Sequence, residues 1–89
     1  MSDYLKKNSD GSITITLEKG VKVDGATIKA LTMREPTVED QLTAQEATKS
    51  AGRAEVTVIA NLCEVAPNDI ARLTLRDYGR VQEAYGDFT

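Results

Sequence analysis

The sequence predicts an α+β fold: an N-terminal β-hairpin followed by a bundle of three helices, two longer and one or more short, packed on one face of the hairpin. Two observations predict it. Apolar and polar residues alternate over most of residues 13–33, as in strands, and apolar residues recur every three or four positions over residues 37–88, as in helices. We expect residues 1–11 to be a flexible tail and residues 12–89 to be a single domain, with the hairpin over 12–33 and the helical part over 37–89.

The hairpin is predicted by alternation and by its turn. Apolar residues occupy odd positions over residues 13–23, and Lys19-Gly20 interrupts them in a way that suggests a bulge. Asp24-Gly25 predicts a two-residue type I′ turn, because both central residues of that turn need positive φ. In the return strand, over residues 26–33, the apolar residues do not all fall on alternate positions. A one-residue bulge near Lys29 would place its five apolar residues on the core face: Ala26, Ile28, Ala30, Leu31 and Met33.

A sharp boundary separates the hairpin from the first helix. Pro36 moves Glu35 out of the helical region of backbone conformation, so the strand cannot continue directly into a helix. Thr37 then predicts the N-cap, and Asp40, three residues later, supplies the acidic half of a capping box. This structural role explains the whole motif that begins at Arg34.

The first helix, over about residues 37–49, has few apolar anchors. Val38 and Leu42 are its only large apolar residues. One interpretation is a poorly anchored surface helix. The other is functional: a helix held by few apolar contacts is the element that rearranges most easily when a partner binds.

The second helix, over about residues 53–65, is better built. Its apolar stripe recurs at i, i+3, i+4 and i+7, and its members are Val56, Ile59, Ala60 and Cys63. We assign this stripe to the core. A short helical turn then follows over residues 66–70, with Pro67 at its first position.

The last helix, over about residues 75–86, begins with a second T-x-x-D cap at Thr74 and Asp77. Its stripe holds three of the four aromatic residues, and its positions are Tyr78, Val81, Tyr85 and Phe88. We assign Tyr78 and Val81 to the core. For Tyr85 and Phe88 two interpretations stay open, core packing or an interface, since aromatic residues near a chain end are good anchors for a partner.

Composition argues against several functional classes. The formal charge is −3 and no basic stripe is visible, so we expect no nucleic-acid partner. No apolar run approaches the roughly 20 residues that span a bilayer, and the N-terminus carries no signal-peptide pattern, so we expect no membrane association and no export. The chain has no histidine, and its one cysteine lies in an apolar stripe. We therefore predict no enzymatic activity, no metal site and no cofactor.

Several short motifs occur in a defined order along residues 13–88. An apolar strand leads into the turn at Val23-Asp24-Gly25, and the segment from Leu31 to Thr37 reads L-T-M-R-E-P-T, with Asp40 after it. D-Y-x-x-V over residues 77–81 then precedes a closing Phe88. In this order and spacing, the chain resembles the tail assembly chaperone family of Mu-like and related contractile-tailed bacteriophages.

The resemblance implies a small non-enzymatic protein that binds the long helical tape measure protein, keeps it soluble and helps tail tube subunits assemble around it. It implies the host cytoplasm as the location and absence from the mature virion. Tape measure protein and tail tube protein are the implied partners, and we also expect a homo-oligomer, because a chain this short is marginally stable alone. We predict that the partner contacts Val38, Leu42, Tyr85 and Phe88.

Two alternatives stay open. The chain could be a minor structural protein of the tail or baseplate, or a small bacterial protein-binding adaptor such as an antitoxin-like module. The first would be found in assembled particles and the second would not depend on phage proteins.

Overall fold

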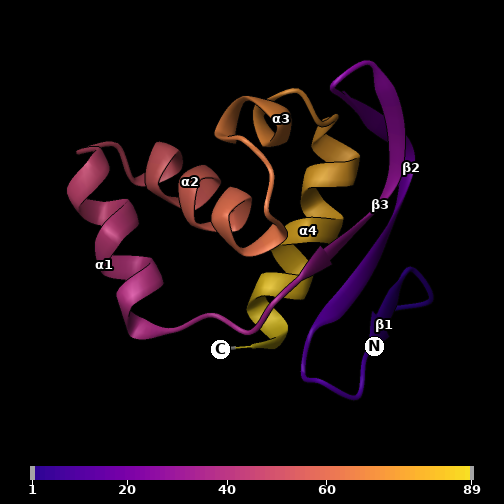
Figure 1. Ribbon diagram of the computed structural model, residues 1–89, viewed down its shortest axis with the longest axis horizontal. Coiled ribbons are helices and arrows are strands. Elements are labelled where there is room, and N and C mark those ends of the chain that lie inside the picture. Colours follow the sequence, from indigo (N-terminus) through magenta and orange to yellow (C-terminus); the bar gives the residue numbers. More distant parts are fainter. Residues whose placement is uncertain (1, 89) are drawn as a thin grey trace.

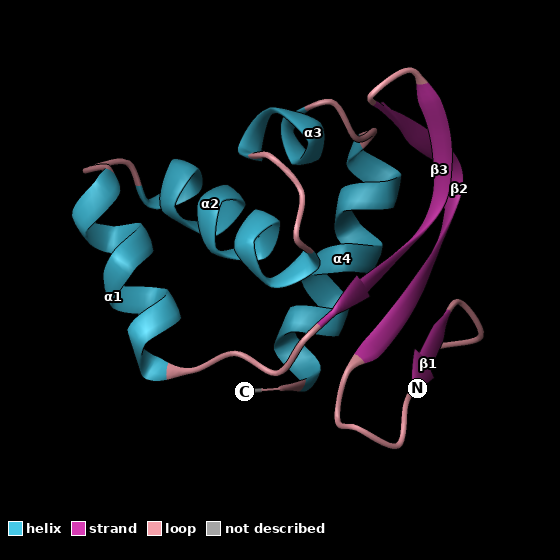
Figure 2. Ribbon diagram, in the orientation of Figure 1, coloured by secondary structure: helices cyan, strands magenta, loops and turns pink. Residues whose placement is uncertain are grey.

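The structure, a computed structural model, describes residues 2–88. It confirms the predicted α+β class, because an antiparallel sheet comes first in the chain and helices follow. The helices gather on one side of the sheet (Figures 1 and 2). The strands are β1 (Leu5–Lys7), β2 (Ile13–Val23) and β3 (Ala26–Met33), and the helices are α1 (Val38–Ala47), α2 (Ala51–Cys63), α3 (Pro67–Ala71) and α4 (Leu75–Asp87).

The N-terminal segment forms a strand where the sequence predicted a flexible tail. β1 pairs with the start of β2, with Leu5 opposite Ile15, and the Leu5 side chain is buried. The hydroxyl of Tyr4 donates to Glu83 Oε1 at 2.6 Å, and the guanidinium of Arg80 lies 4.3 Å from the centre of the Tyr4 ring. A strand of three residues is too short to show alternation, so its pairing with β2 cannot be predicted from the sequence pattern.

The turn and the bulge of the hairpin are confirmed. Asp24 and Gly25 have φ of 52° and 84°, as a type I′ turn requires. The pairing of β2 with β3 shifts between Thr16 and Val21, where residues 17–20 of β2 lie opposite Lys29 alone. Gly20 has φ of 81°. A Cβ there would lie 2.6 Å from the carbonyl oxygen of Ile28, so only glycine fits.

The predicted position of the apolar residues in β3 is partly wrong. Leu31 and Met33 are buried and Ile28 is partly buried, but Ala26 and Ala30 are exposed. The extra residues of the bulge belong to β2 rather than to β3. Ala30 therefore stays paired with Thr16 and shares its exposed face.

The helix boundaries differ from the sequence prediction mainly in α2. This helix begins at Ala51 rather than near Arg53, because the Ser50 hydroxyl accepts a hydrogen bond from the Arg53 backbone N–H and serves as N-cap. It ends at Cys63 rather than near Val65, since Glu64 adopts the left-handed conformation with φ of 58°. Residues 50–52, which lie between the two predicted helices, thus hold the N-cap and the first residues of α2.

The helices form two layers over the sheet. α4 and α3 pack on β2, and α2 packs on β3. α1 packs on α2 instead and lies on the side of the molecule away from the sheet, so the bundle covers one face of the hairpin through its inner helices (Figure 1). The core lies between the sheet and the inner layer, and its largest fully buried apolar side chains are Ile13, Ile15, Met33, Ile59, Leu62, Ile70 and Val81.

Candidate partner-binding groove

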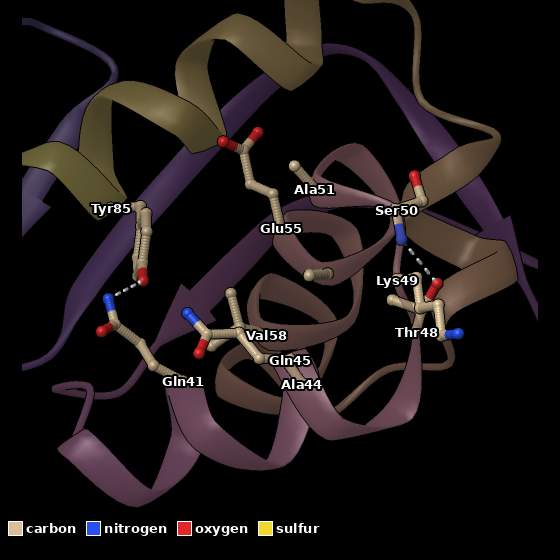
Figure 3. Close-up of a pocket in the computed structure, with 11 residues that line it drawn as sticks. Gln41, Ala44, Gln45, Thr48, Lys49, Ser50, Ala51, Glu55, Val58 and Tyr85 are labelled. Atoms are coloured by element: carbon tan, nitrogen blue, oxygen red, sulfur yellow. Dashed lines mark hydrogen bonds between the residues drawn. The ribbon is translucent and has the colours of Figure 1, made fainter.

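An open groove of about 540 Å³ lies between α1 and α2 and reaches the C-terminal half of α4. Gln41, Ala44 and Gln45 line it from α1. The segment 48–50, which connects α1 to α2, closes one end, and Tyr85 of α4 stands at the other (Figure 3). The groove is thus built by two consecutive helices, α1 and α2, together with α4 from the end of the chain.

Small side chains create the hollow. Ala44 and Val58 are buried at its base. Ala51 and Ala54 line it along α2, and their spacing from Val58 puts all three on one face of that helix. Alanine fills little of the space between two packed helices, so this part of the α1–α2 contact stays open.

Polar groups of the groove connect the three helices. The side-chain amide of Gln41 donates to the Tyr85 hydroxyl at 2.8 Å, which joins α1 to α4. Glu55 of α2 accepts from the Tyr78 hydroxyl, and from the Gln82 amide at 2.8 Å. Burial, followed by this bond to Glu55, raises the pKa of Tyr78, so its hydroxyl stays protonated and donates.

The four residues that the sequence proposed for partner binding lie in different settings. Val38 and Leu42 are exposed by 76 % and 46 %, while Tyr85 and Phe88 are partly buried and pack against the core. Tyr85 also lines the groove, and its hydrogen bond with Gln41 ties it to α1. Phe88 is not among the groove-lining residues.

Sequence reasoning missed most of the groove. It named Tyr85 but did not identify Gln41, Gln45, Glu55 or Val58. Val58 is buried although it falls outside the stripe predicted for the second helix. The available signal was the alanines themselves, Ala44 in α1 with Ala51 and Ala54 one helical turn apart in α2.

The motif from Arg34 to Asp40 sets the start of α1, and its predicted capping box is confirmed. The Thr37 hydroxyl accepts from the Asp40 N–H at 3.2 Å, and Asp40 accepts from the Thr37 N–H at 2.8 Å. Arg34 adds a bidentate ion pair to the same carboxylate, with both N–O distances 2.8 Å. The hydrogen bond from Arg34 is the main cause that lowers the pKa of Asp40. Glu35 and Pro36 lie between Arg34 and Thr37, outside any helix or strand.

The second predicted cap is only half present. The Thr74 hydroxyl accepts from the Asp77 N–H at 3.2 Å, but the Asp77 carboxylate turns away from the helix start. It accepts backbone N–H groups of the β2 bulge from Glu18, Lys19 and Gly20, at 2.7, 3.0 and 3.1 Å. Burial raises the pKa of Asp77, but these three hydrogen bonds and the positive charge of Arg80 together outweigh burial, so the pKa is lowered.

The structure offers little reactive chemistry. Burial raises the pKa of the Cys63 thiol to about 12, so it is not a nucleophile at neutral pH. Across residues 2–88, no group of three or more His, Cys, Asp or Glu side chains is placed to hold a metal ion. None of the described helices combines the length and the apolar character needed to cross a bilayer.

A hollow with an apolar base, polar walls and exposed apolar neighbours is the geometry of a site that binds another molecule. Comparison with known families identifies the kind of protein. The family described as phage tail assembly chaperone proteins, E, or 41 or 14, matches residues 14–89, and the chain belongs to this family. Neither a curated relative nor a solved structure matches it. The protein therefore has a role in phage tail assembly, with tail proteins as its partners.

Proposed function

We propose that this protein binds the tape measure protein in the host cytoplasm, keeps it soluble and assists assembly of the tail tube around it. It catalyses no reaction and does not remain in the mature virion. The tail tube protein is a second partner, and the chain works as a small homo-oligomer.

One observation carries the proposal within this family: α1 exposes apolar side chains beside an open groove. Val38 and Leu42 are exposed, and Ala44 is the buried residue by which α1 is anchored. A protein that holds a long helical client needs apolar surface of this kind together with a polar exterior. No catalytic side chain is needed for that task.

Co-expression with the cognate tape measure protein tests the proposal. We expect the tape measure protein to be soluble and to co-purify with this chain, and to aggregate when it is expressed alone. The role is wrong if the soluble fraction of tape measure protein is the same with and without the chain.

Alanine substitutions separate the two interpretations of the C-terminal aromatic residues. Tyr85 lines the groove and also packs against the core, so Tyr85→Ala should lower both the melting temperature and tape measure recovery, and it should lower recovery more than Phe88→Ala does at a comparable loss of melting temperature. Phe88 packs against the core outside the groove, so Phe88→Ala should lower the melting temperature. A lowered melting temperature in Tyr85→Ala with unchanged recovery would assign Tyr85 to the core alone.

Mass spectrometry of purified virions separates this role from that of a minor tail or baseplate protein. A chaperone should be depleted from particles relative to the tube protein. A fixed copy number in every particle would favour the structural role.

A further inference from the structure

The outer face of α1 presents two apolar side chains that the described residues leave largely or half exposed. Val38 and Leu42 lie four residues apart, so they are neighbours on the helix surface. They are exposed by 76 % and 46 %, although α1 turns another face toward α2. This apolar pair is the first part of a candidate surface.

The pair is continuous with the groove. Gln41 follows Val38 by three residues and Gln45 follows Leu42 by three, so each glutamine lies beside one member of the pair. Both glutamines line the groove, whose base is formed by Ala44 and Val58 (Figure 3). We call the apolar pair, the two glutamines and this base the α1 surface.

The charged residues of α1 itself are all acidic. α1 contains Glu39, Asp40 and Glu46 and no lysine or arginine. Arg34 forms an ion pair with Asp40. Glu39, three residues before Leu42, and Glu46, four residues after it, are both exposed. The last turn of α1 contains no basic residue, so the C-terminal end of the helix dipole adds negative potential there. In the groove itself, Lys49 and Glu55 are opposite charges.

This charge distribution selects among possible occupants. In a second copy packed antiparallel on the α1 surface, Glu39 would face Glu46 of the other chain, and such like-charge contacts are unfavourable. A helix with apolar side chains on one face and lysine or arginine on its flanks would complement both the apolar pair and the two carboxylates.

We propose that the α1 surface binds a cationic amphipathic helix of another protein. Its apolar side chains cover Val38 and Leu42 and enter the groove, and its basic flank pairs with Glu39 and Glu46. This inference rests on the proposed function, for which it defines the segment of the client that is recognised.

A designed peptide tests the chemistry directly. The probe is a fluorescein-labelled amphipathic peptide of roughly 18 residues, five helical turns, with leucine on one face and lysine elsewhere. Its counterparts carry glutamate in place of lysine, or the same leucines and lysines in scrambled order. We expect the lysine peptide to bind at least about tenfold more tightly than either counterpart, and its affinity to fall as salt is added.

Variants with matched controls locate the site. Leu42→Ala should weaken binding of the lysine peptide about five- to tenfold, because it removes apolar contact area, while alanine keeps α1 helical. Glu39→Gln with Glu46→Gln should weaken it about three- to tenfold. The controls are Leu75→Ala, at a leucine that is 89 % exposed on α4, and Asp3→Asn with Glu64→Gln, at exposed acids outside α1. They should change affinity less than about twofold.

The outcomes distinguish this inference from the proposed function. Equal binding of the lysine and glutamate peptides, or equal losses in Leu42→Ala and Leu75→Ala, would overturn the inference. In co-expression, full solubility of tape measure protein with Leu42→Ala and the double glutamine variant would leave the function standing and remove the α1 surface from it. Tape measure protein that stays insoluble with the wild-type chain would instead remove the function, whatever the peptides do.

Discussion

Asp77 connects helix α4 to the irregular part of the sheet through one buried carboxylate. The residue is fully buried, and its two oxygens accept backbone N–H groups from Glu18, Lys19 and Gly20. Those N–H groups lie in the bulge, where the ladder with β3 is interrupted. Because a buried N–H without an acceptor is costly, Asp77 replaces the missing strand partner.

Asp77→Asn should therefore destabilise the fold strongly. The amide keeps one accepting oxygen but puts an NH₂ group where Lys19 and Gly20 need an acceptor. We expect a loss of about 2–3 kcal/mol in the free energy of unfolding, measured by urea denaturation. Asp87→Asn, in the exposed last turn of the same helix, is the matched control and should change stability by less than about 0.5 kcal/mol. Equal effects of the two substitutions would contradict this role of Asp77.

The pH dependence of stability follows from the lowered pKa values of Asp77 and Asp40. Since the folded-state values lie below the unfolded ones, the unfolded chain binds more protons at low pH. Both groups thus contribute stability above the unfolded carboxyl pKa of about 3.9, and lose it as the pH falls through the folded-state values. The free energy of unfolding, measured with urea, should be nearly constant from about pH 6 to 8, because the chain has no histidine. It should fall below about pH 4 to 5. This loss of stability at low pH should be smaller in Asp77→Asn than in the wild-type protein. An equal loss in both would show that Asp77 does not contribute to it.

At the scale of elements, β2 depends on a single backbone conformation at its bulge. Gly20→Ala places a Cβ 2.6 Å from the Ile28 carbonyl oxygen and forces φ of 81° on an L-residue, so we expect a loss of about 2 kcal/mol or more. Gly79, in α4, has open space where a methyl group would lie, and alanine there should stabilise the helix by about 0.5–1 kcal/mol. Thermal and urea unfolding of the two variants should shift in opposite directions. A shift in the same direction would show that the bulge tolerates a side chain.

Local signals predicted the elements that depend on local chemistry. The Asp24-Gly25 turn, the Thr37–Asp40 capping box and the order of strands and helices were readable, because each depends on a few neighbouring residues. β1 was not, since Leu5 is a strand residue only through its pairing with Ile15. The same reason hid the role of the Asp77 carboxylate, whose hydrogen-bond donors are 57 to 59 residues away.

The groove was harder to predict than the fold. Val38 and Leu42 were recognisable because apolar side chains are conspicuous in a polar helix. The hollow beside them arises from small side chains, since alanines at positions 44, 51 and 54 leave space only when α1 and α2 are packed together. A cavity of this kind belongs to a pair of helices, and a pattern along one helix does not reveal it.

Across the whole molecule, stability is unevenly distributed between the two helical layers. The inner helices contact the sheet and share its core, whereas α1 contacts α2 and buries Ala44. α1 is further held at its start by Arg34 and at its middle by the bond between Gln41 and Tyr85. We therefore expect α1 to open locally while the rest of the fold stays intact.

Native-state hydrogen exchange can measure this opening residue by residue. Backbone amides of α1 should exchange with an opening free energy at least about 2 kcal/mol below that of β2 and α4, which report global unfolding. Tyr85→Phe removes the hydroxyl that accepts from Gln41, and should lower protection in α1 by a further amount of about 0.5–1.5 kcal/mol without affecting β2. Tyr4→Phe removes a comparable hydrogen bond, to Glu83, and should lower protection in β1 but not in α1. If α1 amides exchange only through global unfolding, α1 is a fixed part of the fold, and a partner must bind the groove as it stands.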